Sequence, residues 1–194
     1  MRLAVFDRTQ GKLTATWRAG TVLYRGLGRL DATFGATSWS DALDWLADAK
    51  EPIDEIQYWG HGKWGSVLVD RDVLSSKSLN GALRQKLEAV RERLAPDALV
   101  WLRTCESFGA IAGHDFAQRL ADFFGVRVAG HTYVIHAWQS GLHGLRPGAK
   151  PDWSASEGLA EGTPDDPKRA HSSVPGAPRT ITCFTGVVPP EWFT

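Results

Sequence analysis

The chain has 194 residues, of which 43% are hydrophobic and 23% charged, and these are the proportions of a single globular domain with a sizeable core. Its 22 Lys and Arg residues balance its 22 Asp and Glu residues, so no net basic field exists to attract nucleic acid or an anionic membrane. Two cysteines are too few for a disulfide scaffold or a cysteine-based metal site, although a single bond between Cys105 and Cys183 could form in an oxidising compartment.

The N-terminal part of the chain predicts three strands and two helices. Residues 3–6 form a short apolar run that suits a first strand and is too short for a signal peptide. Residues 12–38 are ambiguous, with a short helix expected around 22–27 and an edge strand over 30–34. A clear helix follows over 41–49, capped by a serine and acidic in its first turn. Residues 53–59 predict the next strand.

The middle of the chain continues this alternation. Residues 64–70 contain glycine and β-branched residues and predict a small hairpin. Leucines at helical spacing predict a long helix that begins at Ser78 or Asn80 and ends at Leu94. Residues 98–102 are almost entirely apolar and predict a strand buried on both faces. A helix over 112–124 and a strand over 126–130 follow.

The C-terminal third has a different composition. Residues 133–135 either extend the preceding strand or form a second short one. Residues 141–180 are rich in Gly, Pro, Ser and Asp, which predicts a long loop-rich segment pinned by Trp153 and Leu159. Residues 180–188 predict a closing strand. The alternation of strands and helices predicts one domain over 1–194, an α/β fold built as a three-layer α/β/α sandwich with a mostly parallel sheet.

Two of the predicted strands lead into chemically useful side chains. Residues 53–59 run into His61, and residues 98–102 run into Cys105. Because a helix connects these strands, we expect them to be parallel neighbours, and parallel strands present their carboxyl ends at one edge of the sheet. An imidazole and a thiol would then meet in one crevice and form a Cys–His nucleophilic site.

This pair would need further groups around it. The thiol must lose its proton to become a strong nucleophile, and His61 could take it, whereas Glu106 beside the thiol would oppose ionisation. The backbone amides of Gly62 and Cys105 could hold the developing oxyanion. Taken singly, Cys105 could instead be a packed strand residue and His61 a turn residue.

Two more aromatic side chains are candidates for the crevice wall. Trp64 follows His61 closely, and His131 follows the strand over 126–130, so both are expected to face substrate. His131 and His136 are five residues apart and would point to opposite faces of a strand, which does not suit a zinc site. We therefore expect no metal.

The order strand, His-Gly, hairpin, helix, strand, Cys resembles the caspase-like cysteine peptidases. Cys105 lies 44 residues after His61, and caspases place their histidine about 50 residues before the cysteine. The resemblance covers roughly residues 1–135 and implies a caspase-like sandwich with His61 and Cys105 as the catalytic pair. The segment Arg103-Thr104-Cys105-Glu106-Ser107 departs from the caspase pattern Gln-Ala-Cys-x-Gly, so no subfamily follows from it.

The resemblance also implies substrate-binding positions and an activity. Arg8 and Arg103 correspond to positions that form the pocket for the residue before the cut, and they would favour an acidic side chain unless Asp7 neutralises one of them. The implied activity is that of a cysteine endopeptidase-like hydrolase working through an acyl-thioester on a peptide or protein substrate, without cofactor or metal.

Other functions remain open at this level. The main alternative is a catalytically inactive caspase-like domain that serves as a binding or assembly module. A small-molecule hydrolase or acyltransferase with the same dyad is a third. We expect no nucleic-acid or membrane partner and a cytoplasmic location, and the sequence predicts no particular oligomeric state.

Overall fold

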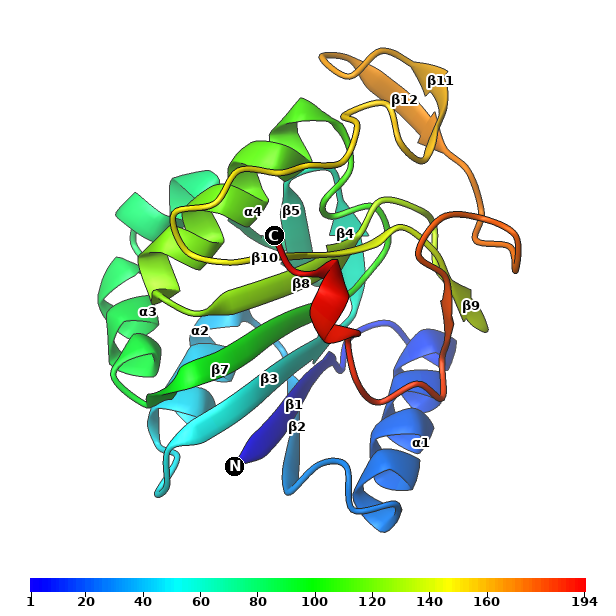
Figure 1. Cartoon of the computed structure of the whole chain (residues 1–194). Coiled ribbons are helices and arrows are strands. Elements are labelled where there is room, and N and C mark those ends of the chain that lie inside the picture. Colours follow the sequence, from blue (N-terminus) through cyan, green and yellow to red (C-terminus); the bar gives the residue numbers. More distant parts are fainter.

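A computed structural model describes all residues, 1–194, and is built around one six-stranded sheet (Figure 1). In spatial order the strands are β10 (Leu142–Leu145), β8 (Arg127–His131), β7 (Leu94–Arg103), β3 (Ile53–Trp59), β1 (Arg2–Asp7) and β2 (Ala32–Ala36). Every neighbouring pair is parallel except β8 and β10, which are antiparallel. The mixed α/β class and the mostly parallel sheet agree with the prediction from the sequence.

Three helices cover one face of the sheet: α2 (Trp39–Ala47), α3 (Arg84–Arg91) and α4 (Ala110–Phe124). Alternate residues of β1 show how this face is built, because Leu3 and Val5 pack into the main core together with apolar residues of these helices. Ser38 begins α2 as expected, since its hydroxyl accepts a hydrogen bond from the Asp41 amide. Gly125 ends α4 in the left-handed conformation.

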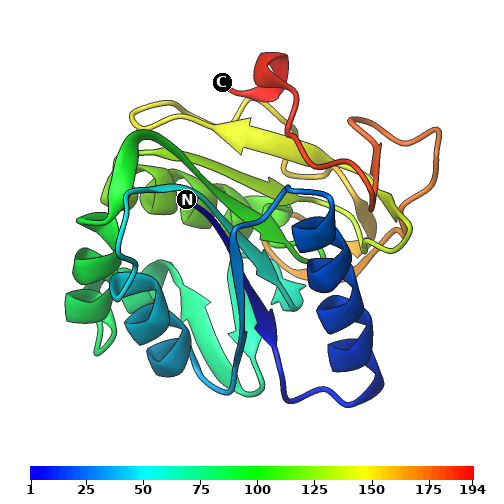
Figure 2. The ribbon, with the colours of Figure 1, turned by 90° about the horizontal axis from the view of Figure 1, so that it is seen from below.

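The opposite face is covered by one helix and by irregular chain (Figure 2). Helix α1 (Lys12–Gly26) packs on Ala4 and Phe6, the other alternation of β1. The C-terminal segment, which contains β13 (Ile181–Thr182) and the 3-10 turn Pro190–Trp192, packs on Trp101 of β7. Three layers are present, but this outer layer has a single helix.

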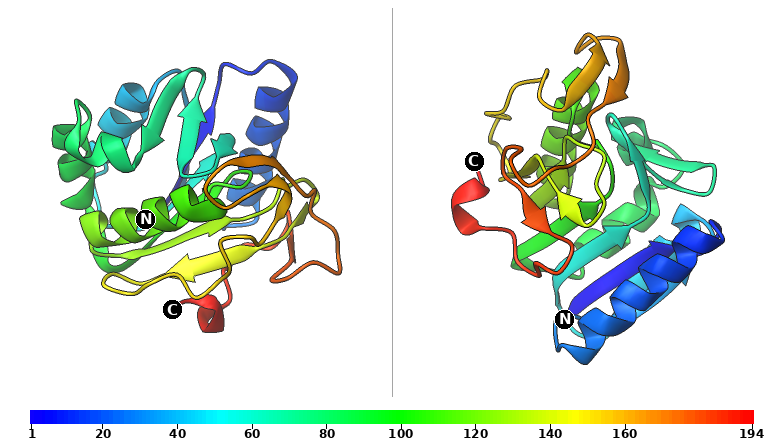
Figure 3. Two further views of the ribbon diagram at one scale, coloured as in Figure 1. Left: turned by 90° about the horizontal axis from the view of Figure 1, so that it is seen from above. Right: turned by 90° about the vertical axis from the view of Figure 1, so that its right-hand side faces the viewer.

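A small antiparallel sheet extends the chain beyond the end of β3 (Figure 3). Its strands are β4 (His61–Lys63), β5 (Ser66–Val69) and β6 (Asp72–Ser75), and its apolar residues join the main core. The expected hairpin over 64–70 is therefore part of a three-stranded unit that begins at His61. This arrangement places His61 at the start of a strand and not in a free loop.

Several expected boundaries were wrong. Residues 12–26 form one 15-residue helix in place of a short one. The predicted helix over 78–94 is divided into a 3-10 turn, Ser76–Asn80, and the shorter α3, because Gly81 interrupts it in an extended conformation. Residues 133–135 form no strand.

The C-terminal third also differs from the expectation. The segment 141–180 contains β10, β11 (Leu159–Gly162) and β12 (Pro167–Ala170), and the last two form a projecting arm (Figure 1). The closing strand shrinks to β13, which pairs with β9 (Trp138–Gln139). Trp153 does pin this region, since it is buried and its indole nitrogen donates to the Phe108 carbonyl. No helix of the chain combines the length and hydrophobicity needed to cross a bilayer.

Candidate active site

The ends of β3 and β7 bring the segments that carry His61 and Cys105 into contact. These strands are parallel neighbours with Trp59 opposite Arg103, so His61 and Cys105 each lie two residues beyond a paired position. A Cβ atom on Gly62 would lie only 2.4 Å from the carbonyl oxygen of Cys105. The expected adjacency of the two strands is confirmed, and glycine at position 62 is what allows the two segments to touch.

His61 and Cys105 line the same cavity, whose volume is about 660 Å³. It lies between α1 and the irregular chain that follows β8. Leu13, Trp17 and Leu23 of α1 form one wall. Residues 134–137, with Cys183 and Phe184 of the C-terminal segment, form the other. A cavity of this size is in the range of about 300–1,000 Å³ that is usual for ligand sites.

His61 is held by packing. Its ring is partly exposed and meets the Trp17 ring edge-on, with the ring centroids 5.5 Å apart. No hydrogen bond from the rest of the protein reaches either ring nitrogen, and no carboxylate orients the ring. Both nitrogens are therefore free to form a hydrogen bond with a thiol, a substrate or solvent.

Cys105 is a partly buried free thiol. Its Sγ lies 4.0 Å from the carbonyl oxygen of Ile135, at the limit of a weak hydrogen bond. Burial raises the pKa of Cys105 above its ordinary value, and the neighbouring Glu106 carboxylate raises it further, while Lys63 acts in the opposite direction. The thiol is consequently protonated at neutral pH and requires a base before it can attack.

An ion pair joins the two segments beside this thiol. The Nζ atom of Lys63 lies 2.9 Å from Oε1 of Glu106, whose side chain is only 6% exposed, and it also lies 3.9 Å above the ring of Trp64. Glu106 adopts a φ of 39°, a conformation that non-glycine residues rarely take. Glu106 was expected beside the thiol, but Lys63 was not, because their proximity depends on how β4 folds back beside the segment after β7.

Arg103 lines the cavity, but both of its terminal nitrogens already donate hydrogen bonds within the protein. Its Nη1 donates to the Tyr24 hydroxyl at 2.8 Å and to the Thr185 carbonyl at 3.2 Å. Its Nη2 donates to Gln139 Oε1 at 2.9 Å and to the Cys183 carbonyl at 3.1 Å. Arg103 therefore holds the C-terminal segment against the sheet.

Aromatic rings also pack against the Arg103 guanidinium. Its guanidinium lies 4.3 Å from the ring centroid of Trp101 and 5.0 Å from that of Trp59. Its Nε is buried and has no partner within the protein. Asp7 does not neutralise it, because the Asp7 carboxylate accepts hydrogen bonds from Thr9 and from the Asp70 amide.

Three residues expected to bind substrate do not line this cavity. Arg8 is exposed and packs beside Gly35 on β2. Trp64 turns toward the loop after Cys105, where it would contact a Cβ added to Gly109. His131 is fully buried, with Nδ1 3.1 Å from the Ser140 carbonyl, because β10 pairs with β8 and covers it. Burial lowers the pKa of His131 to about 3.

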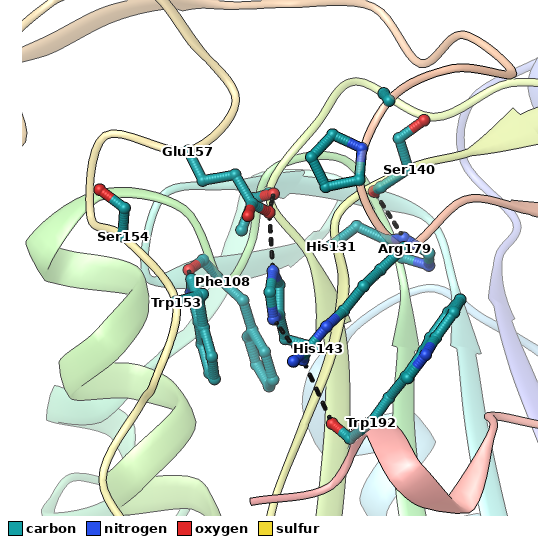
Figure 4. A network of polar contacts seen from close by, with 12 residues as sticks. Phe108, His131, Ser140, His143, Trp153, Ser154, Glu157, Arg179 and Trp192 are labelled. Carbon is teal, nitrogen blue, oxygen red and sulfur yellow. Dashed lines mark hydrogen bonds and ion pairs between the residues drawn. The ribbon is translucent and has the colours of Figure 1, made fainter.

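A second cluster of polar side chains lies away from the cavity and holds the segment 141–180 (Figure 4). Arg179 Nη1 donates to Nδ1 of His143 at 2.8 Å, and since arginine can only donate, this nitrogen carries no proton. The other nitrogen, Nε2, therefore donates to Glu157 Oε1 at 2.6 Å, and the imidazole is neutral. Thr132 donates to the same carboxylate oxygen at 2.7 Å.

This cluster keeps Glu157 ionised. Burial alone would raise the pKa of Glu157, but the hydrogen bond from His143, the hydroxyl of Thr132 and the charge of Arg179 lower it below the ordinary value. His143 also stacks on Trp153, with ring centroids 4.4 Å apart. None of these residues lines the cavity, so the cluster is a scaffold for the chain around the site.

Most of the cavity wall was not predicted from the sequence. Trp17 and Tyr24 lie on a helix that was predicted to be much shorter, and Cys183 lies just beyond β13, a strand that was predicted to continue through it. No group of three or more His, Cys, Asp or Glu side chains is arranged to bind a metal ion.

The chain belongs to a family described as a domain of unknown function (DUF4347), whose match covers residues 33–141, more than half of the chain. This region contains both strand ends that carry His61 and Cys105, but it leaves out α1 and the C-terminal segment. No curated protein matches the chain.

Proposed function

We propose that this protein is a cysteine peptidase of caspase-like fold that cleaves a peptide bond through an acyl-thioester on Cys105. The observation that carries the proposal is that His61 and Cys105 enter one cavity from equivalent positions on neighbouring parallel strands. The resemblance from sequence requires a histidine after the third parallel strand and a cysteine after the next. The sheet order and the direction of β3 and β7 support that requirement.

The residues at the cavity suit each step. His61 takes the proton of the Cys105 thiol, and the sulfur bonds to the carbonyl carbon of the substrate while the carbonyl oxygen becomes an oxyanion. The amides of Gly62 and Cys105 would donate to that oxygen, and the Cys105 amide takes part in no backbone hydrogen bond. Collapse of the oxyanion breaks the C–N bond, and the amine leaves with the proton from His61. Water then hydrolyses the thioester.

Because the pKa of Cys105 is raised, His61 has to remove the thiol proton during the attack. A thiol that is protonated at rest reacts only when a base removes its proton in the attack step. The chemistry needs no metal or cofactor, since the nucleophile, the base and the oxyanion donors all come from the chain.

The alternative function, a caspase-like domain that binds without cleaving, is favoured by two observations. Burial holds the Cys105 thiol in its protonated form, and no side chain fixes the His61 ring through a hydrogen bond. Against this alternative, no residue of the segment 141–180 lines the cavity, so that segment does not plug it.

Labelling with peptidyl acyloxymethyl ketones tests the proposal, and the chain supplies its own control. Cys183 is the second thiol of the cavity, so Cys105→Ala and Cys183→Ala each leave one free thiol there. We expect the wild type and Cys183→Ala to be labelled and Cys105→Ala to be unlabelled, with all three equally folded by circular dichroism. Equal labelling of the wild type and Cys105→Ala would refute the proposal, and iodoacetamide labelling without ketone labelling would support the binding domain.

A further inference from the structure

The cavity beside Cys105 is apolar over most of its wall. Eleven of its 18 lining residues are hydrophobic. On the α1 side Leu13, Trp17 and Leu23 face it, and Val134 and Ile135 lie on the side of the chain after β8. A group that enters this cavity from the carbonyl attacked by Cys105 would therefore exchange water for hydrocarbon.

Arg103, the cationic residue of the cavity wall, does not provide a binding site for a substrate carboxylate. All four Nη hydrogens of Arg103 are already donated within the protein, to Tyr24, Gln139 and two backbone carbonyls. Its remaining Nε has no partner within the protein but is buried, so it is not exposed to a substrate. A carboxylate could reach the guanidinium only by displacing the C-terminal segment, and otherwise it would lose its hydration without gaining a donor.

The other polar groups of the cavity do not change this balance. His61 and Cys105 are assigned to the reaction, the Gln139 side-chain oxygen is held by Arg103, and the Thr16 hydroxyl donates to the Lys12 carbonyl. His136 is the remaining polar side chain of the lining, and it is exposed to solvent. Acidic residues are absent from the lining, so a cationic substrate group would also find no partner there. The walls therefore match a group that is large, uncharged and apolar.

We propose that the cavity selects substrates with a large apolar side chain, aromatic or long aliphatic, next to the carbonyl that Cys105 attacks. This inference rests on the proposed function for the reaction, but the preference of the cavity itself can be measured without any peptide cleavage. It replaces the acidic preference that the position of Arg103 implied by resemblance.

Alkylation of Cys105 by three matched reagents tests the preference directly. In each reaction the sulfur displaces chloride from a CH₂ group and forms a thioether, while the thiol proton passes to His61 or solvent. The reagents are N-benzyl-2-chloroacetamide, 2-chloroacetamide and 2-chloroacetate, and each rate is divided by the rate with glutathione to remove intrinsic reactivity. Using Cys183→Ala protein confines the reaction in the cavity to Cys105.

We expect the normalised rate with the benzyl reagent to exceed that with 2-chloroacetamide at least tenfold and that with 2-chloroacetate by more. Equal rates with all three reagents would overturn the inference, because no apolar pocket would then be acting. A preference for 2-chloroacetate would also overturn it and would show that Arg103 receives an anion.

Two substitutions on α1 give a matched comparison. Leu23 is 44% exposed and lines the cavity, whereas its neighbour Val22 is 61% exposed and lies outside it. Leu23→Asn should reduce the benzyl preference several-fold, and Val22→Asn should leave it unchanged. Equal effects of the two variants would refute the assignment of this wall.

Peptide substrates then separate this inference from the proposed function. With coumarin amides that differ only in the residue before the cut, Phe or Leu should be cleaved at least tenfold faster than Asp. A benzyl preference without cleavage of any peptide would refute the peptidase and leave the apolar pocket established. Cleavage with a preference for Asp would support the peptidase and refute the pocket.

Discussion

Substitution of Gly62 by alanine tests the contact on which the site depends. Gly62 follows His61, and its backbone lies against the segment that carries Cys105. An added Cβ would lie 2.4 Å from the Cys105 carbonyl oxygen and 2.6 Å from the Thr104 hydroxyl oxygen. Because ordinary contacts of such atoms begin near 3.4 Å, the two segments would have to move apart by roughly 1 Å.

The displacement should affect reactivity more than stability. Overpacking of this kind costs about 1–3 kcal/mol of folding free energy. A misplacement of about 1 Å between reacting groups can reduce a rate by about 100-fold, and here it would fall between the imidazole and the thiol. We therefore expect Gly62→Ala to remain folded at 25 °C but to lose at least 95% of its ketone-labelling rate.

Gly26→Ala is the matched control for this experiment. A Cβ on Gly26 meets no atom within 4 Å, and this position at the end of α1 should gain about 0.5–1 kcal/mol from alanine. Labelling rates and urea unfolding would be measured for both variants. A Gly62→Ala protein with the stability and labelling rate of the wild type would show that the two segments are not in the contact described.

Three other substitutions give independent tests. Glu106→Gln should lower the pKa of Cys105 without restoring its ordinary value, because burial remains, and the pH profile of iodoacetamide alkylation should shift to lower pH; an unchanged profile would contradict this charge effect. His131 is neutral in the folded protein, so its stabilising contribution is complete above pH 6.5 and is lost as the pH falls toward its folded pKa of about 3. Between pH 7 and pH 5 this loss should be about 2 kcal/mol, and urea unfolding of His131→Asn should lack it. Tyr24→Phe leaves one hydrogen of buried Arg103 without an acceptor, which should cost about 1–3 kcal/mol in the same measurement, and a wild-type midpoint would argue against the clamp on the C-terminal segment.

The part of the site that could be predicted from sequence is the part determined by continuous apolar runs. Residues 53–59 were predicted as a strand with the observed boundaries, and residues 98–102 are the buried end of β7. Because a helix connects the two strands, their parallel pairing followed, and it placed the segments of His61 and Cys105 side by side. No contact between distant residues had to be known for that step.

Helix α1 could not be predicted at its full length for a physical reason. Only Thr21 and Tyr24 of its 15 residues are buried, while Val22 and Leu23 are exposed, so the apolar positions do not repeat at helical spacing. The apolar side chains that break the pattern include one that lines the cavity. The apolar pattern of α1 is thus irregular because one of its apolar side chains faces the cavity and not the core.

Strand β10 was missed because its burial depends on residues far away in the sequence. All four of its residues are buried, including His143, and a buried histidine is costly without partners. Its partners, Glu157 and Arg179, lie 14 and 36 residues further along the chain. Since β10 also covers His131, missing this strand produced the wrong expectation for that residue.

The segment 141–180 therefore holds one wall of the cavity in place through backbone contacts. Its residue Ser172 bridges to Val134, and the amide of Val134 donates to the carbonyl of His171. Val134 is a cavity wall residue, so the position of the wall depends on the chain that the His143 cluster holds. A composition rich in glycine and proline indicates irregular backbone, but here the irregular backbone is fixed by a fully paired neutral imidazole and an ionised carboxylate. Loss of that carboxylate's charge in acid would loosen the wall directly, because the wall depends on this ion and the hydrogen bonds of the sheet do not.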